Sequence, residues 1–158
     1  GKELLRREIS FSLLLDILLG TGSEGFYHLY DEGLVDDGFA TGFTGDESFG
    51  HVMVGGRTDD PQQLQEKLLE IFTKARGMGI KGDTLARSKK KLWGSFISGL
   101  NSLEVLAGQY VKDYRRGLHL SDHFRLLAEI RTDELEELLH CHLSHEQAAY
   151  SIIEPYGE

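Results

Sequence analysis

Residues 18–35, LLGTGSEGFYHLYDEGLV, place a glycine-rich turn between two helical patterns and decide how the fold begins. Before the turn, apolar residues recur at helical spacing from Lys2 to Leu19, which predicts an amphipathic helix with a broad apolar face. The turn at residues 20–22 ends that helix, and Ser23 is a good N-cap for a short second helix that Gly33 closes. The chain is therefore expected to open with a helix, a glycine turn and a helix.

After this stretch, the hydrophobic period changes from that of a helix to that of a strand. Two alternating segments, residues 37–44 and 49–56, flank a turn at residues 45–48, and this pattern predicts a β-hairpin. Several glycines weaken the strand propensity of both segments, so we expect another backbone or a helix to pack closely on one face.

The remainder of the chain predicts four or five helices and one strand. Asp60 followed by Pro61 indicates a helix that continues to Gly77, because a capping residue precedes proline at the first helical position. Asp83 is expected to cap another helix, helical periodicity resumes from Ser102, and Ser121 and Thr132 are expected to begin two further short helices. The alternating residues 147–153 predict a closing strand that ends at Pro155.

Three strands form a thin sheet for so many amphipathic helices, since each helix must bury its apolar stripe. We therefore expect an α+β fold in which helices cover an antiparallel sheet that lacks its first strands, and we expect these strands before Gly1. The length and the ordinary apolar and charged fractions fit a single domain over residues 1–158.

The composition argues against several classes of partner. Seventeen basic and 26 acidic residues give a net charge of −9, which opposes nonspecific binding to nucleic acid or anionic lipid. The longest apolar run, residues 11–19, is too short to cross a bilayer, and the mixed charges before it do not fit a secretory leader. A single cysteine fits a reducing compartment, so we expect a cytoplasmic protein.

Residues 140–146, HCHLSHE, contain three histidines, the only cysteine and a glutamate. A zinc site needs three or four such ligands that converge on one point. On a helix, however, His140 and His142 diverge by about 200°, and His145 lies at or past the helix end. We therefore expect no metal site here and interpret His140 and His145 as residues near a helix C-terminus, where imidazole interacts well with the dipole.

Three other clusters have ordinary structural interpretations. The basic run at residues 87–91 lies on a predicted helix and is interpreted as its solvated face. The glycine turn at residues 20–25 follows a helix and lacks the lysine of a phosphate-binding loop. The carboxylates of residues 31–37 have no nucleophile beside them. By residues and spacing alone, the chain is a soluble α+β domain without a recognisable catalytic centre.

The order of several motifs resembles the pitrilysin/insulinase superfamily of zinc metallopeptidases, which includes the mitochondrial processing peptidases. Residues 18–35 resemble the glycine-rich turn and serine-initiated helix of that superfamily, and EGLVDD resembles its divergent bacterial branch. The order continues through GGRTDDP (residues 55–61), LWGSF (92–96), NSLE (101–104) and TDEL (132–135). The resemblance covers nearly the whole chain and rests on the order and spacing of all these motifs.

This resemblance implies a LuxS/processing-peptidase-like lobe of a two-lobed chamber. In that superfamily the N-terminal lobe carries zinc on an inverted His-x-x-Glu-His motif, whereas the C-terminal lobe lacks zinc and helps to hold the peptide. The sequence contains no such motif, so it resembles the later part of a C-terminal, non-catalytic lobe. The implied partners are a peptide substrate and an N-terminal lobe or homologous partner chain, and the implied zinc belongs to the other lobe, with no cofactor in this chain.

The resemblance also implies candidate substrate contacts. Active members place an arginine and, a little later, a tyrosine of this lobe against the substrate. Counted from Phe26, the arginine position is Tyr30, and the tyrosine position is Asp36 with one residue deleted or Asp37 with none. Both replacements remove donors that would stabilise a peptide oxyanion.

Two other functions stay open beside the substrate-holding lobe. Alternatively, the chain is a catalytically inactive protein-assembly module derived from the same superfamily. Replacement of the arginine and the tyrosine that contact the substrate in active members is compatible with this function. A third possibility, an autonomous metal-binding domain built on residues 140–146, requires zinc to stabilise the fold.

Overall fold

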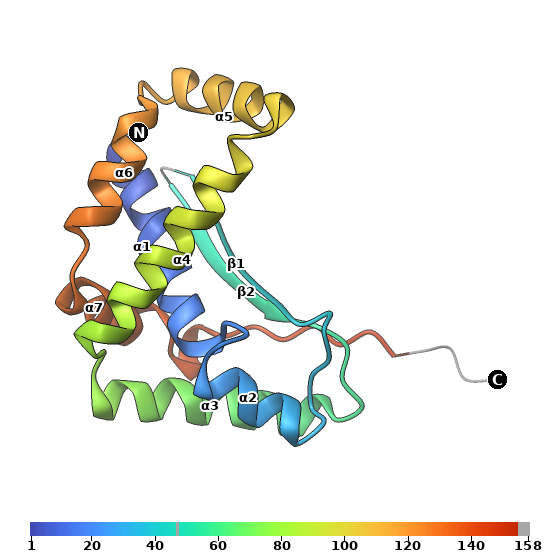
Figure 1. Ribbon diagram of the computed structural model, residues 1–158. Coiled ribbons are helices and arrows are strands. Elements are labelled where there is room, and N and C mark those ends of the chain that lie inside the picture. The colour runs from blue at the N-terminus through green and yellow to red at the C-terminus, as the bar shows by residue number, and fades with distance from the viewer. Residues whose placement is uncertain (47, 155–158) are drawn as a thin grey trace.

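The computed structural model describes residues 1–46 and 48–154. Over these residues, seven α-helices, one two-stranded sheet and a short 3₁₀-helix succeed one another, with α3 across one end of the molecule and α5 at the other (Figure 1). The helices are α1 (Lys2–Leu19), α2 (Glu24–Asp31), α3 (Pro61–Met78), α4 (Gly82–Gly99), α5 (Leu103–Arg115), α6 (Leu120–Glu129) and α7 (Thr132–His142); the strands are β1 (Ala40–Gly45) and β2 (Gly50–Gly55), and the 3₁₀-helix is His145–Gln147.

The helix α1 forms the centre of the core, as its broad apolar face predicted. It packs against β1 and against α2, α3, α4, α6 and α7. Leu13 and Leu14 are completely buried, and buried residues occur on nearly every side of the helix. A helix that is apolar almost all round is typical of a core position. The surrounding amphipathic helices therefore bury their stripes mainly against α1.

The glycine turn after α1 has the expected geometry. The Ser23 hydroxyl accepts a hydrogen bond from the Phe26 N–H at 3.0 Å and donates one to the Leu18 carbonyl at 3.1 Å. Gly33 follows α2 with a φ of 69°, a left-handed conformation that favours glycine. Local capping chemistry therefore fixes both ends of this connection.

The hairpin packs closely on α1, as its glycines indicated. Phe43 of β1 lies opposite Val52 of β2, and its ring stacks on Phe11 of α1 with 4.5 Å between the ring centroids. A Cβ atom at Gly50 would lie 2.8 Å from the Phe43 ring, so this close approach requires glycine. The strands are shorter than predicted, because residues 36–39 form a turn in which the Phe39 N–H donates to the Asp36 carbonyl at 3.0 Å.

The prediction of a strand over residues 147–153 is wrong for this structure. Gln147 ends the 3₁₀-helix, and residues 148–154 have no regular secondary structure. A strand needs a partner backbone to pair its N–H and C=O groups, and the described sheet contains only β1 and β2, so this segment pairs with neither strand. Pro155, and position 47 of the predicted turn, lie outside the described residues.

Two helix starts also differ from the prediction, by two residues for the cap of α4 and by one residue for the start of α6. The helix α4 begins at Gly82 with Lys81 in the capping position, rather than with Asp83 as the cap. The helix α6 begins at Leu120, because the Asp122 carboxylate accepts a hydrogen bond from the His119 N–H at 2.9 Å and closes the turn before Ser121.

The described sheet has only two strands, which agrees with the expected α+β lobe that lacks strands. No single described helix is long and apolar enough to cross a membrane, and only α1 and α2 taken together across a bend of 47° meet the length and composition criteria.

A candidate peptide-binding groove

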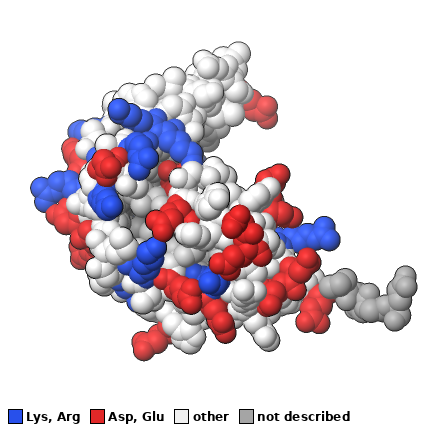
Figure 2. All heavy atoms as spheres, turned by 60° about the horizontal axis from the view of Figure 1, so that its bottom comes forward, with Lys and Arg blue, Asp and Glu red and all other residues white. Residues whose placement is uncertain are grey.

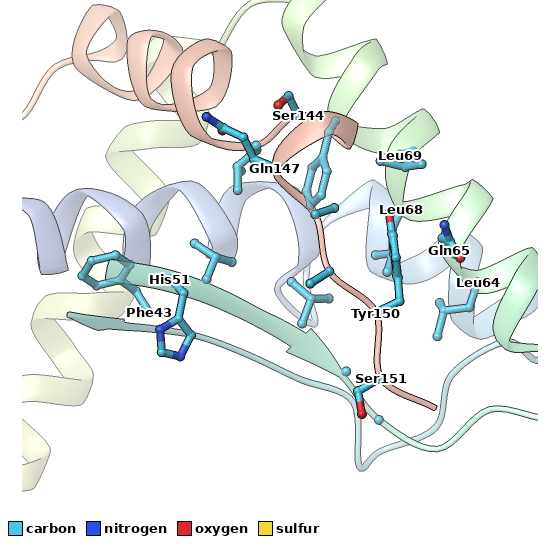
Figure 3. A pocket seen from close by; sticks show the side chains of 18 of the residues that line it. Phe43, His51, Leu64, Gln65, Leu68, Leu69, Ser144, Gln147, Tyr150 and Ser151 are labelled. Carbon is cyan, nitrogen blue, oxygen red and sulfur yellow. The ribbon is translucent and has the colours of Figure 1, made fainter. Parts of the chain in front are cut away.

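A groove with a volume of about 730 Å³ is lined by β2, α3 and the C-terminal segment 148–153 (Figure 3). In the ribbon, residues 148–153 run between β2 and α3 (Figures 1 and 3). The groove thus brings together three segments that are far apart in the sequence.

The periodicities of one helix and one strand give the groove an apolar floor. On α3, Leu64, Leu68 and Phe72 recur every four residues and therefore lie on one face. On β2, Val52 and Val54 alternate with more exposed residues and turn their side chains toward the core and the groove. An extended chain with apolar side chains is the ligand that this floor suits.

One wall of the groove is an open strand edge. The Asp46 N–H donates to the Phe49 carbonyl at 2.9 Å, so the alternation of an antiparallel ladder directs the backbone groups of Gly50, Val52 and Val54 away from β1. These three residues line the groove, and the described sheet has no strand beyond β2. Their N–H and C=O groups are therefore placed to pair with an added strand.

The opposite wall is also backbone with spare hydrogen-bonding capacity. Between residues 148 and 154, the structure describes a single backbone–backbone hydrogen bond, which the Ala148 N–H donates to the His145 carbonyl at 3.2 Å. The open edge of β2 and this irregular segment thus line the same apolar groove. This is the arrangement by which proteins bind extended peptides as an additional strand.

Basic groups border this groove. Among its described lining residues are Arg7, Arg57, His51 and His142, but no carboxylate. The Arg7 guanidinium lies 5.5 Å from the centroid of the Phe43 ring and donates to the Phe49 carbonyl at 2.9 Å. It therefore fixes the hairpin tip on α1 and contributes positive charge to one end of the groove.

The predicted contact Tyr30 lies in the last turn of α2, outside the groove lining. Its side chain is half exposed, and its ring stacks on Phe26 with 5.8 Å between centroids. Phe26 in turn contacts Phe39, and the Phe39 backbone adjoins Gly56, which does line the groove. Tyr30 therefore reaches the groove only through these intervening aromatic residues.

The predicted contacts Asp36 and Asp37 are both exposed in the connection between α2 and β1. The Asp36 carboxylate accepts a hydrogen bond from the Gly38 N–H at 2.8 Å, which shapes the turn into the hairpin. Neither residue is among the described groove lining. The sequence motif and the groove are thus separate candidate contact regions of one lobe.

The sequence predicts that an extended peptide adds to the outer strand of the hairpin by backbone pairing, but it did not predict that α3 and residues 148–153 would join this strand in one groove. The alternation of residues 49–56 and of residues 147–153 indicated strands. It did not indicate that these two segments would border the same apolar groove.

The cluster at residues 140–146 does not converge. His140 and Cys141 are exposed, His142 lies with its ring centroid 5.9 Å from that of Phe11, and Leu143 is buried. Across the described residues, no three His, Cys, Asp or Glu side chains are placed to share a metal ion. The alternative of an autonomous metal site therefore has no geometric support among these residues.

The basic run at residues 87–91 is only partly a solvated face. Arg87 and Lys90 are exposed, but Lys89 donates to the Ala128 and Ile130 carbonyls at 2.8 and 2.5 Å, and burial lowers its pKa. Lys91 pairs with Asp16 of α1. Two of these lysines therefore tie α4 to its neighbours.

Comparison with known proteins gives relatives for this architecture. No family model matches the chain. The chain is 33% identical over 139 residues to the "uncharacterized zinc protease YmfH" of Bacillus subtilis (strain 168), a match that covers 88% of this chain and 32% of that protein.

Two solved structures share the fold. A protein from Alicyclobacillus acidocaldarius assigned as an M16-like peptidase is 26% identical, with a TM-score of 0.86 over 91% of this chain and 35% of that one. The inactive peptidase domain of a protein from Bordetella parapertussis assigned as a zinc protease is similar in fold alone, at 14% identity, with a TM-score of 0.72 over 95% of this chain and 84% of that one. The chain thus spans about a third of the length of the first two relatives.

Proposed function

Because the chain belongs to the pitrilysin/insulinase-type superfamily and spans part of one of its lobes, we propose that it is the substrate-holding, zinc-free part of a bacterial zinc metallopeptidase. In this proposal the chain supplies a wall of the chamber, and zinc held elsewhere in the protein supplies hydrolysis. The main support is the groove, in which the open edge of β2 adjoins an apolar floor.

The charge of the adjoining face favours basic side chains on the part of the substrate that extends beyond the groove, whose own border is basic. Figure 2 shows the end of the molecule that carries α2 and α3, where acidic side chains gather. Asp31, Glu32, Asp36 and Asp37 are exposed there, beside Tyr30. Carboxylates in water attract cationic groups over roughly one Debye length, about 8–10 Å at physiological salt. We therefore assign Tyr30, Asp36 and Asp37 as contacts for the basic side chains of an extended polypeptide.

The experiment that tests these contacts uses the complete gene product with its metal removed, so that a labelled basic peptide binds without being cut. Tyr30→Ala combined with Asp36→Asn is expected to weaken the peptide affinity about tenfold, the loss of roughly 1.4 kcal/mol. The amide oxygen introduced by Asp36→Asn remains an acceptor for the Gly38 N–H and so preserves the turn. Tyr27→Ala is the control, since Tyr27 is an exposed tyrosine of the same helix outside the predicted pair.

The second candidate function is a catalytically inactive assembly module. It is favoured by the fold shared with an inactive peptidase domain and by the replacement of the arginine and tyrosine positions. Unchanged peptide affinity in the double variant, together with an altered oligomer size in sedimentation, would support the module and overturn the clamp. EDTA-sensitive peptide cleavage by residues 1–158 alone would overturn both.

A further inference from the structure

The helix α5 presents its apolar side chains to solvent. Its only buried residue is Asp113, whereas the side chains of Leu103, Tyr110 and Tyr114 are 83%, 68% and 75% exposed. In Figure 1, α5 stands away from the core at the end of the molecule opposite α3. In the space-filling view, the projecting end of the molecule is almost free of charged side chains (Figure 2).

The exposed residues share one face of the helix. Leu103, Ala107, Tyr110, Val111 and Tyr114 follow one another at spacings of four, three, one and three residues, and we call this set the α5 face. The rings of Tyr110 and Tyr114 stack with 6.4 Å between centroids. Clustered tyrosines are typical of the centres of protein interfaces, because they supply a large contact area at a low cost in side-chain entropy.

Polar contacts hold α5 in this orientation. The Asp113 carboxylate contacts His123 Nε2 of α6 at 3.0 Å and accepts a hydrogen bond from Gln109 Nε2 at 2.8 Å. Arg116, just after the helix, donates to both carboxylate oxygens of Glu8 at 3.0 Å. The inward side of α5 is therefore fixed by hydrogen bonds, and the apolar side is left without a described neighbour.

An isolated helix of this length is unfavourable in water. Helices shorter than about 12–15 residues are marginal on their own, and most helices in proteins are stabilised by packing an apolar face. The helix has 13 residues and packs its apolar face on nothing that the structure describes. A further surface over this face would supply the missing stabilisation.

We propose that another part of the same, longer polypeptide covers the α5 face. The chain spans 32% and 35% of two relatives, so most of a polypeptide of their length lies outside the matched part. In addition, Gly1 packs against the carbonyl of Arg116, so any residues joined before Gly1 emerge beside the C-terminal end of α5. The interface is independent of the peptide bound by the lobe, and it requires only the longer polypeptide.

Thiol labelling of the complete gene product tests this proposal. In a Cys141→Ser background, Val111→Cys places the only engineered thiol on the α5 face, and Glu70→Cys places a control thiol on the exposed side of α3. We expect Val111→Cys to react at least about tenfold more slowly than Glu70→Cys, since labelling then requires local opening of the interface. Tyr114→Cys provides a second probe if the first variant does not fold.

The possible outcomes are distinct. Protection that persists in a monomer at low protein concentration supports the proposal, and serine at both Tyr110 and Tyr114 should then restore fast labelling of Val111→Cys. Equal labelling of the face and control thiols would overturn it. Protection that appears only with a concentration-dependent dimer would also overturn it and would identify a second copy as the cover.

Discussion

Glu134 at the start of α7 and Arg6 on α1 form a multidentate ion pair, with 2.7 Å between Arg6 Nη2 and Glu134 Oε2. Arg6 Nε lies 3.1 Å from both carboxylate oxygens, and the Ser10 hydroxyl donates to Glu134 Oε1 at 2.7 Å. This network fixes the first turn of α7 on the central helix. Leu135 and Leu139, which are completely buried, follow on the same helix.

The Glu134 network predicts a pH-dependent stability. Burial by itself raises the pKa of Glu134, but hydrogen bonds from Arg6 and Ser10 outweigh it and lower the pKa below its ordinary value. A carboxyl whose folded-state pKa is lowered stabilises the fold above its unfolded pKa, about 4.3, and this stabilisation is lost as the pH falls through the folded pKa. Glu134→Gln should therefore lower the free energy of unfolding by about 1 kcal/mol at neutral pH.

The loss caused by Glu134→Gln should shrink as the pH falls below about 4, where the wild-type carboxyl also becomes protonated. Urea unfolding at a series of pH values measures this difference. Glu137→Gln, an exposed change on the same helix, is the control and should show little effect. A difference of the same size at every pH would contradict the assigned role of the carboxylate.

The central position of α1 predicts a large cost for truncating its buried leucines. Leu13→Ala should lower the free energy of unfolding by about 3 kcal/mol, because it removes buried apolar contacts and leaves a cavity. Leu103→Ala makes the same chemical change at the exposed α5 face and should change the stability of the chain by less than about 0.5 kcal/mol. Similar losses in denaturant unfolding would contradict the assignment of α1 as the core.

The helix cap at Asp60 gives a smaller, local prediction. The Asp60 carboxylate accepts a hydrogen bond from the Gln63 N–H at 2.9 Å at the start of α3. Asp60→Ala should therefore cost about 1 kcal/mol of stability. Asp59→Ala changes the neighbouring exposed carboxylate and serves as the control. Equal thermal unfolding of the two variants would show that the cap contributes nothing.

The sequence predicted those elements whose ends are set by local chemistry. Ser23 and Asp60 were expected to cap helices, and each accepts a hydrogen bond from the backbone N–H three residues later; Ser102, expected only as the start of a helix, does the same. The apolar run of α1 likewise indicated a buried helix, because helical periodicity is a local property. These features needed no knowledge of distant contacts.

Features that depend on distant segments were predicted less well. Residues 147–153 alternate as a strand does, but pairing requires another backbone, and the structure leaves the segment unpaired. The groove arises where this segment meets β2 and α3, and no local pattern indicates such a convergence. For Tyr30 and Asp36, the structure gives exposure and neighbours, and their role as substrate contacts stays a prediction.

The groove predicts that a charge in its apolar lining blocks an extended ligand. Leu69→Arg, a partly buried lining position on α3, should weaken peptide binding to the complete gene product at least about tenfold, since a bound peptide would bury this unpaired charge at a cost of more than about 1.4 kcal/mol. Glu66→Arg is the control, because residue 66 is exposed on the same helix and outside the described lining. Fluorescence anisotropy with a labelled peptide gives the two affinities.

Two outcomes would count against the groove as a peptide site. One is equal affinity of the Leu69→Arg and Glu66→Arg variants. The other is failure of the Leu69→Arg variant alone to fold, which would indicate that the protein fills this space with its own backbone.

The pair formed by Asp113 and His123 predicts how α5 is held. His123→Phe keeps an aromatic ring against Phe96, whose centroid lies 4.9 Å from that of the imidazole, but removes the nitrogen that contacts the buried Asp113 carboxylate. The buried carboxylate then keeps only its hydrogen bond from Gln109, and loss of the His123 contact costs about 1–3 kcal/mol, so α5 should open locally. Amide exchange in α5 should therefore accelerate about tenfold or more, whereas exchange in α1 stays unchanged, and His140→Ala at an exposed site should leave both unaltered. Acceleration of α1 and α5 together would mean that the pair stabilises the whole fold rather than the position of one helix.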